Sequence, residues 1–312
     1  MDMRQLGSHG PDISVVGSGA WEAGGDMWGA EVDDRDTVRA IEAGLDAGMN
    51  WIDTAEAYGD GRSERLVGEI ARRRTEVMVF TKVAHFASGS RPHEIRKAIE
   101  GSLQRLGLDA VDLYQVHWPN ERKVPIEDTW GAMTQLRHEG LARAIGVSNF
   151  DRSLVERCEA IGHVDSVQNQ FSLLSNGDRD DLIPWLRAHG IGYLAYGPLA
   201  FGLLSGTFDA ATSFHDDDWR SGKGVRLGYY DELFAPGRFE QQLERVQRLR
   251  PIAQRLGVAV PTLALRAAVD AHGVTGVIAG TRNASHASAN AQAGDLALDA
   301  ATMREITDAV GA

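Results

Sequence analysis

The sequence predicts an α/β protein folded as a closed (β/α)8 barrel, the TIM-barrel architecture. Eight short apolar runs rich in Val and Ile alternate with amphipathic segments, and such runs are typical of parallel strands buried on both faces. This alternation requires a parallel sheet with right-handed crossovers. A chain of 312 residues without a break in composition suits eight such units in a single domain, residues 1–312. A doubly wound open sheet is the alternative.

The predicted strands are short and bounded by glycine or polar residues. They cover residues 15–19, 50–55, 77–83, 111–118, 142–149, 166–170, 191–196 and 276–280. The apolar stretch Gly190–Phe208 holds five glycines and one proline, which indicates a strand entering a tight loop rather than a membrane span. No membrane partner is therefore expected.

Amphipathic helices are predicted between the strands. The first has Asp33 as its cap and ends at Gly48, while Pro92 and Pro125 stand where a first-turn proline is tolerated. The predicted helices cover residues 33–48, 62–74, 92–107, 125–140, 151–162, 178–190, about 238–257, and 285–293.

Two segments stand outside this repeat. Residues 1–14 are predicted to form a hairpin before the first barrel strand. Residues 205–237 are predicted to form a long polar loop after the seventh strand, and loops of this length are often functional. The N-terminus lacks the apolar run of a signal peptide, and the single cysteine, Cys158, excludes an intrachain disulfide, so we expect a cytoplasmic protein.

Charge and motif content exclude several classes of partner. The chain carries 32 Lys and Arg against 44 Asp and Glu, a net charge of −12, which argues against nucleic acid binding. No His and Glu cluster has zinc-ligand spacing, so no metal site is predicted. The sequence leaves the oligomeric state open between a monomer and a weak oligomer.

Polar residues at the carboxyl ends of the strands form the candidate catalytic site, because barrel enzymes place it there. Asp53 ends the second strand and Tyr58 follows five residues later, Lys82 ends the third strand, and His117 ends the fourth. A buried Lys82 needs a carboxylate, which Asp53 on the neighbouring strand can supply. We expect the ammonium to lower the pKa of Tyr58 and make it a proton donor. With His117, this donor would polarise a carbonyl group for attack by a hydride.

The chain resembles the aldo-keto reductase superfamily, in its bacterial type, over nearly its whole length. The resemblance rests on GSGAW (17–21), NWIDTAEAYGDGRSERLVGE (50–69), VFTKV (79–83), DLYQVHWP (112–119), AIGVSNF (144–150), SVQNQFSLL (166–174), AYGPLAFGLLSG (195–206) and VIAGTRN (277–283). The family's catalytic tetrad corresponds to Asp53, Tyr58, Lys82 and His117. The resemblance implies an NADP-dependent oxidoreductase that reduces a small aldehyde or ketone, with NADH a less favoured cofactor.

The resemblance also implies the cofactor contacts. Ser148, Asn149 and Gln168 would hold the nicotinamide carboxamide, and Tyr196 would stack on its ring. The loop after the seventh strand would line the pyrophosphate, and the segment after the eighth would hold the adenosine half. The implied set is Gly19, Ala20, Trp21, Asp53, Ser148, Asn149, Gln168, Tyr196, Gly197, Pro198, Leu199, Gly202, Leu204, Gly206, Gly280, Thr281, Arg282, His286 and Asn290.

Two departures from the family pattern affect this assignment. His286 and Ala289 stand where members often have a basic residue or glutamine and then a glutamate, so Arg282 is the candidate for a 2′-phosphate. GSGAWEAG (17–24) imitates a dinucleotide fingerprint but has Glu22 at its third glycine, and we interpret it as a wall of the pocket. The expected substrate pocket comprises Trp21, Tyr58, Phe86, His117 and Trp118.

Two other functions remain open at this point. A barrel lyase would form a Schiff base on Lys82, although an ion-paired lysine is a poor candidate for that role. A non-enzymatic nucleotide-sensing subunit could be built on the same barrel.

Overall fold

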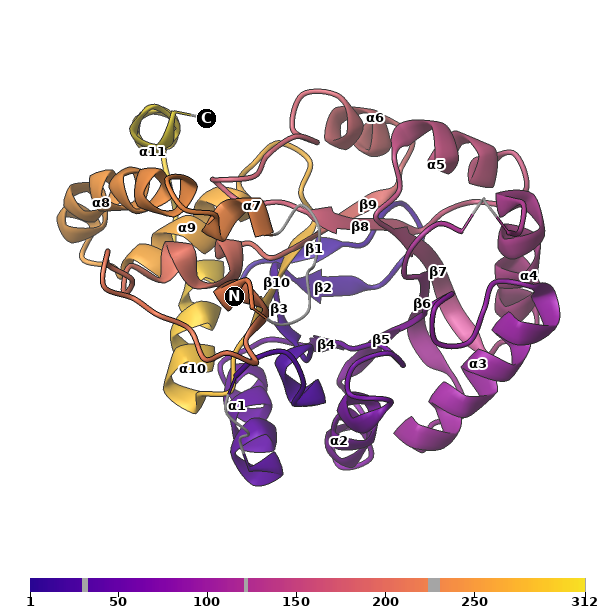
Figure 1. Cartoon of the computed structure of the whole chain (residues 1–312). Coiled ribbons are helices and arrows are strands. Elements are labelled where there is room, and N and C mark those ends of the chain that lie inside the picture. The colour runs from indigo at the N-terminus through magenta and orange to yellow at the C-terminus, as the bar shows by residue number, and fades with distance from the viewer. Residues whose placement is uncertain (30–32, 121–122, 224–230, 312) are drawn as a thin grey trace.

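Eight parallel strands close into a barrel in the computed structural model, which describes residues 1–29, 33–120, 123–223 and 231–311 (Figure 1). Neighbouring strands follow the order β10-β3-β4-β5-β6-β7-β8-β9, so both edges of the sheet are paired. This confirms the predicted TIM barrel and excludes the open sheet. The strands are β3 (Val16–Gly19), β4 (Trp51–Asp53), β5 (Met78–Val83), β6 (Val111–Val116), β7 (Ala142–Ser148), β8 (Ser166–Gln170), β9 (Gly192–Tyr196) and β10 (Gly276–Gly280).

Helices surround the barrel, and several begin at the side-chain caps that the sequence offers. Asp33 accepts a hydrogen bond from the Arg35 amide and Asp151 one from the Leu154 amide, which satisfies backbone donors that the helix leaves unpaired. The helices between the first seven strands are α1 (Asp34–Asp46), α2 (Arg62–Ala71), α3 (Pro92–Leu106), α4 (Ile126–His138), α5 (Arg152–Glu159) and α6 (Leu182–Ala188). After β10 come α10 (Ala284–Ala291) and α11 (Ala300–Val310).

Between β9 and β10 the structure holds more than the sequence predicted. The predicted helix is present as α8 (Arg238–Leu256), but α9 (Val260–Val269) follows it and packs on the barrel, with α8 outside it (Figure 1). Leu265 and Val269 of α9 join the core around the barrel, whereas Leu263 joins an outer cluster with α8 and α11. Because both faces of α9 are buried, its sequence lacks the polar stripe that reveals a surface helix. That is why sequence periodicity missed it.

The long loop after β9 is partly ordered into short helices. It contains η2 (Ala200–Ser205), η3 (Trp219–Ser221) and α7 (Asp231–Phe234), while residues 224–230 of the predicted loop lie outside the described residues. The side chain of Trp219 is only 1% exposed and packs with Trp28 and Phe201. The loop is therefore fastened to the barrel by an aromatic cluster.

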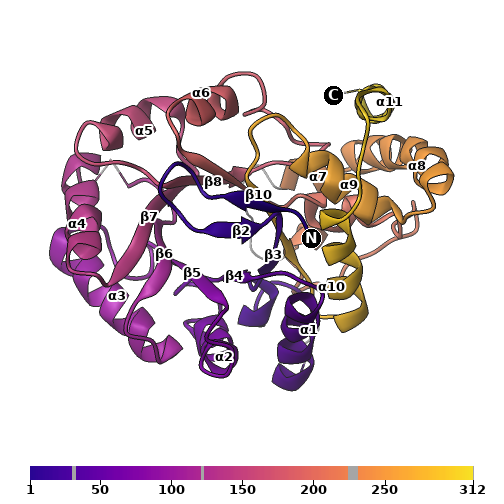
Figure 2. The same cartoon turned by 180° about the vertical axis from the view of Figure 1, so that it is seen from behind.

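The barrel interior is apolar at its N-terminal end. Inward-facing Trp51, Phe80 and Leu113 pack there, and Gly17 is required because a β-carbon on it would overlap the indole of Trp51. The predicted hairpin, β1 (Met3–Gln5) and β2 (Asp12–Ser14), lies across this end (Figure 2). Leu6 and Ile13 from the hairpin segment complete the same apolar cluster.

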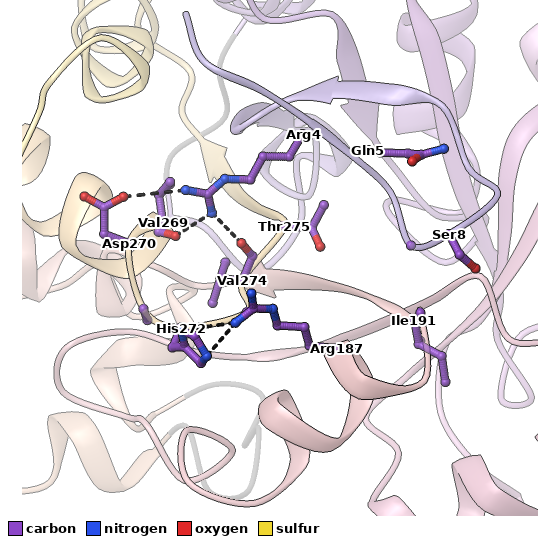
Figure 3. A pocket seen from close by; sticks show the side chains of 14 residues that line it. Arg4, Gln5, Ser8, Arg187, Ile191, Val269, Asp270, His272, Val274 and Thr275 are labelled. Carbon is purple, nitrogen blue, oxygen red and sulfur yellow. Dashed lines mark hydrogen bonds and ion pairs between the residues drawn. The ribbon is translucent and has the colours of Figure 1, made fainter.

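A polar pocket of about 470 Å³ lies at this end of the barrel, between the hairpin and the turn from α9 to β10 (Figure 3). Arg4 donates to the carbonyl oxygens of Val269 at 2.7 Å and Val274 at 2.5 Å and pairs with Asp270 at 3.5 Å. These bonds tie the hairpin to the barrel wall. The predicted catalytic residues lie at the opposite end.

Within the described part of the chain, no helix taken singly has both the length and the apolar composition of a membrane span. α8 and α9 reach those limits only as a pair, bent by 94°. Gly190–Phe208 contains β9 and η2, as the sequence analysis expected of a strand that enters a tight loop.

Candidate active site

A buried ion pair forms the centre of the candidate site. Lys82 on β5 is fully buried, pairs with the carboxylate of Asp53 on β4, and donates to the Thr54 carbonyl oxygen at 2.9 Å. Burial lowers the pKa of Lys82, while the charge of Asp53 and its hydrogen bond oppose that shift. The two residues meet because both side chains face the barrel interior, next to the apolar layer that contains Trp51 and Phe80. The positions of Asp53 and Lys82 at the ends of neighbouring strands predicted this pair.

Tyr58 and His117 lie next to this pair. The Tyr58 hydroxyl is 3.4 Å from Lys82 Nζ, and the Tyr58 ring meets the His117 ring edge-on at 5.6 Å. Burial lowers the pKa of His117 well below its usual value, and Lys82 and His85 add to the shift, so the imidazole is neutral near pH 7. Its buried Nδ1 finds no hydrogen-bond partner among the residues that the structure describes. The four predicted catalytic residues therefore lie together at one end of the barrel.

The expected lowering of the Tyr58 pKa is wrong for this structure. Burial raises the pKa of the phenol well above its usual value, and the charges of Asp53 and Glu22 raise it further. The physical reason is that burial disfavours the charged phenolate and that the nearby carboxylates repel it. Tyr58 is a protonated phenol at neutral pH.

Gln115 on β6 belongs to the same polar layer and was missed in the sequence. Its Nε2 lies 3.5 Å from Asp53 Oδ2, and its Oε1 accepts from Gln168 at 3.3 Å. Gln168 also donates to Asp53 Oδ2 at 2.8 Å. The signal was available, since side chains alternate along a strand and Gln115 precedes the inward-facing His117 by two residues.

The residues expected to hold the nicotinamide form a second network above this layer. Asn149 has a left-handed backbone, φ +63°, donates to the His117 carbonyl oxygen at 3.0 Å and accepts from the Tyr196 hydroxyl at 2.7 Å. Ser148 donates to the Gln168 carbonyl oxygen at 2.7 Å. Gln168 is paired in register with Ser148, and its amide nitrogen donates to Asp53.

The loop that was expected to line the pyrophosphate has a constrained backbone. It contains Gly197, Pro198, Leu199, Gly202, Leu204 and Gly206, and the three glycines have positive φ. Ala200 and Phe201 also adopt positive φ, 47° and 55°, which costs about 1–3 kcal/mol per residue. Arg220 of η3 donates to the Phe201 carbonyl oxygen at 3.0 Å and so fastens the strained turn. Such strain clusters at ligand sites.

The predicted adenosine segment follows β10. Arg282 donates to the Trp28 carbonyl oxygen at 2.9 Å, next to the wall formed by Gly19, Ala20 and Trp21. His286 is exposed in the first turn of α10, and its amide donates to the Asn283 cap at 3.1 Å. Thr281 is half-buried and Asn290 is buried.

The residues expected to line the substrate pocket differ in how buried they are and in which member of the tetrad they approach. Trp21 lies 6.2 Å from the Tyr58 ring and joins the aromatic cluster with Trp28 and Trp219. Phe86 is 63% exposed and its ring lies 6.2 Å from that of His117. Trp118 follows His117 directly and is half-buried. The described residues thus place aromatic groups on two sides of the tetrad.

The residues at this end of the barrel fit a nicotinamide dinucleotide. Gly19 and Gly280 pair in register where β3 and β10 end, and neither contributes a side chain of its own, while the Glu22 carboxylate lies over Gly280. Gln170, paired in register with Tyr196, has a buried Nε2 that no described residue accepts from. This donor and the His117 Nδ1 atom are the kind of unsatisfied groups that a bound ligand completes.

The sequence matches the model of the aldo/keto reductase family over residues 15–310. The aldo-keto reductase YhdN of Bacillus subtilis is 34% identical over 90% of this chain and 85% of its own length. The NADH-specific methylglyoxal reductase of Escherichia coli is 29% identical over 98% of both chains. A probable voltage-gated potassium channel subunit beta of rice is 29% identical over 95% of this chain and 92% of its own.

Solved structures agree with these sequence matches. The glycerol dehydrogenase of Gluconobacter oxydans superposes with a TM-score of 0.87 at 31% identity, covering 99% of this chain and 95% of that one. An aldo/keto reductase of Klebsiella pneumoniae, solved with NADP and acetate, gives a TM-score of 0.76 at 28% identity over 98% and 94% of the two chains. The protein is therefore an oxidoreductase built on a (β/α)8 barrel. It belongs to the aldo/keto reductase family.

Proposed function

We propose that this protein reduces a small aldehyde or ketone to the alcohol with NADPH, and that Tyr58 supplies the proton. The observation that carries the proposal is the position of the Tyr58 hydroxyl, 3.4 Å from a buried ammonium and beside a neutral histidine. A carbonyl oxygen placed between Tyr58 and His117 would receive hydrogen bonds from both side chains.

Each residue of the tetrad has a distinct part in this reaction. Neutral His117 orients the carbonyl oxygen through a ring N–H, and Tyr58 transfers its proton to that oxygen as negative charge develops there. Lys82 stabilises the resulting phenolate, and Asp53 holds Lys82 in its charged form. The nicotinamide, when bound, supplies the hydride.

The raised pKa of Tyr58 bears on the direction of the reaction. A phenol that stays protonated through neutral pH enters each cycle as an acid, as reduction requires. The reverse reaction, alcohol oxidation, needs the phenolate as base. The protonation state of Tyr58 at neutral pH is therefore the one that carbonyl reduction requires.

NADPH is the proposed cofactor, with NADH the less favoured one. Arg282 supports this choice, because a guanidinium can bind a phosphate through two parallel hydrogen bonds. The NADP complex of the Klebsiella pneumoniae relative also supports it, whereas the Escherichia coli relative is NADH-specific. Ser148, Asn149 and Tyr196 are the proposed nicotinamide contacts. We further propose a single domain over residues 1–312 and a cytoplasmic location.

A second candidate function is a nucleotide-sensing subunit without turnover, and the similarity to a probable channel subunit of rice favours a subunit role. One experiment separates the candidates: the purified protein is titrated with NADPH and NADH and then assayed with a panel of aldehydes and ketones. Binding with turnover supports the reductase. Binding without turnover across the panel supports the sensing subunit, and a borohydride-trapped adduct on Lys82 would support the lyase.

A further inference from the structure

Glu56 is a buried carboxylate that the proposed reaction does not use. It lies between Asp53 and Tyr58 in the chain, in the loop after β4, and its side chain is only 6% exposed. Its Oε1 atom accepts from the Ala84 amide at 2.8 Å, and its Oε2 atom accepts from the Ser88 hydroxyl at 2.8 Å. One carboxylate therefore binds both ends of the turn that follows β5.

This turn also has hydrogen bonds of its own. The amides of Ala87 and Ser88 donate to the Ala84 carbonyl oxygen at 2.9 Å and 2.8 Å. They fix the shape of the turn, whereas the Glu56 carboxylate ties it to the loop after β4. The Glu56 amide joins the same two segments, because it donates to the Lys82 carbonyl oxygen at 3.3 Å.

The turn places Phe86 at the rim of the site. The Phe86 ring is 63% exposed and lies 6.2 Å from the ring of His117, with the ring of His85 edge-on at 5.3 Å. An exposed ring has few packing partners, so the backbone of the turn decides where it stands. The position of Phe86, which is expected to line the substrate pocket, therefore depends on the carboxylate of Glu56.

The surroundings of Glu56 explain why a carboxylate is useful at this position. A buried carboxylate costs free energy unless it is hydrogen-bonded, and here it accepts two hydrogen bonds, with Arg105 at 3.9 Å. Arg105 is bound more closely to Glu64, at 2.6 Å. An apolar side chain would avoid the cost of burial but would leave the Ala84 amide without the acceptor that it has here.

We propose that Glu56 is a positioning residue that holds Phe86 beside the substrate by binding both ends of the turn formed by residues 84–88. The inference rests on the proposed function, since it assumes that a carbonyl substrate binds beside Tyr58 and His117. The carboxylate binds the turn, so it acts on the substrate through Phe86. Its effect belongs to KM rather than to kcat, because a wall contacts the bound substrate and the transition state alike.

The test compares Glu56→Ala, which removes both acceptors, with Glu56→Gln. The glutamine can still accept from the Ala84 amide and can donate an amide hydrogen to the Ser88 hydroxyl oxygen. Steady-state kinetics are measured with NADPH and the aldehyde of the panel that the wild type reduces best. KM for the aldehyde should rise roughly tenfold in Glu56→Ala, while kcat and the NADPH dissociation constant stay within about threefold. Glu56→Gln should restore KM to within about threefold of the wild-type value.

Asp165→Ala is the matched control. Asp165 is a buried carboxylate that accepts from the Ile145 amide at 2.8 Å and pairs with Arg137 at 3.2 Å, at the opposite end of the barrel. The control should lose a comparable free energy of unfolding in urea and leave KM unchanged. If Glu56→Ala does not fold, Ser88→Ala removes one of the two donors and should still raise KM about threefold.

A double-mutant cycle assigns the effect to Phe86. In a Phe86→Ala background, Glu56→Ala should raise KM by no more than about twofold further, because the ring that it positions is gone. A full additional rise there, an unchanged KM in Glu56→Ala, or a rise in Glu56→Gln as large as that in Glu56→Ala would overturn the inference. Absence of carbonyl turnover in the wild type would refute the proposed function itself.

Discussion

The two ends of the barrel interior use the same eight strands in opposite ways. At the N-terminal end, Trp51 and Phe80 pack under a hairpin with apolar partners. At the other end lie a buried ion pair, the Nδ1 atom of His117, which has no hydrogen-bond partner among the described residues, and the strained left-handed backbone of Phe201. One end is thus packed with apolar side chains, and the other holds polar and strained groups at the proposed active site.

The strongest test of this contrast is Tyr58→Phe. Loss of the hydroxyl should reduce carbonyl turnover by about 10²-fold or more while NADPH still binds, because only the acid is removed. Steady-state kinetics and a binding titration measure the two effects. Tyr114→Phe, which removes a buried hydroxyl on the outer side of β6, is the control and should retain activity. Turnover near the wild-type level in Tyr58→Phe would remove the assigned mechanism.

Lys82→Met and Asp53→Asn separate the two members of the ion pair. Lys82→Met should abolish most activity and also destabilise the fold by about 3–5 kcal/mol, since it leaves Asp53 buried and unpaired. Asp53→Asn should lower activity less, because Lys82 keeps the Thr54 carbonyl oxygen as a partner. Urea unfolding and kinetics measure the two variants. A larger activity loss in Asp53→Asn would reverse the assigned order.

Phe80→Ala and Phe86→Ala make the same change at the two ends. Phe80 is fully buried in the apolar layer, so its loss should cost about 3–5 kcal/mol of unfolding free energy. Phe86 is mostly exposed at the rim of the site, and its loss should change stability by about 0.5 kcal/mol or less. Chemical denaturation measures both. Equal destabilisation would contradict the division between the two ends.

Arg282→Ala tests the proposed adenosine end. The variant should weaken NADPH about 10- to 100-fold and leave NADH nearly unchanged, because a charge-assisted hydrogen bond contributes ~1.5–3 kcal/mol. Fluorescence titration of both nucleotides measures the difference, with Arg255→Ala on the surface of α8 as the control. An equal loss for both nucleotides would show that Arg282 does not bind the 2′-phosphate.

The smallest effect concerns pH and His117. Its pKa is lowered on folding, so below its usual value of ~6.5 the unfolded chain binds a proton that the folded chain does not. The wild type should therefore lose up to ~1.4 kcal/mol of stability per pH unit below that value as pH falls, and His117→Gln should lose less. Denaturation at pH 7.5 and pH 5.5 measures the difference. Parallel losses in both proteins would show that His117 does not contribute.

The sequence predicted most of the fold because strand periodicity and helix caps are local signals. The four residues of the proposed tetrad could also be predicted from the sequence, since each one ends a predicted strand or follows it by a few residues. α9 was missed because a helix buried on both faces lacks the alternation of apolar and polar residues that marks a surface helix. Gln115 was missed although strand alternation places it on the same face as His117. The Tyr58 pKa was predicted in the wrong direction because it depends on burial and on charges from elements distant in the chain. The assigned roles of the cofactor residues stay predictions.

The burial of α9 on two faces has a consequence for how the chain folds. All eight barrel strands are complete at Gly280, before α11 (Ala300–Val310) is synthesised. Until then the outer cluster on α8 and α9 lacks Ile306 and Val310, which are fully buried in the finished protein. An apolar seam beside Leu263 therefore stays open until α11 docks on α8 and α9. Truncations before residue 300 should aggregate even though every residue of the proposed tetrad is present.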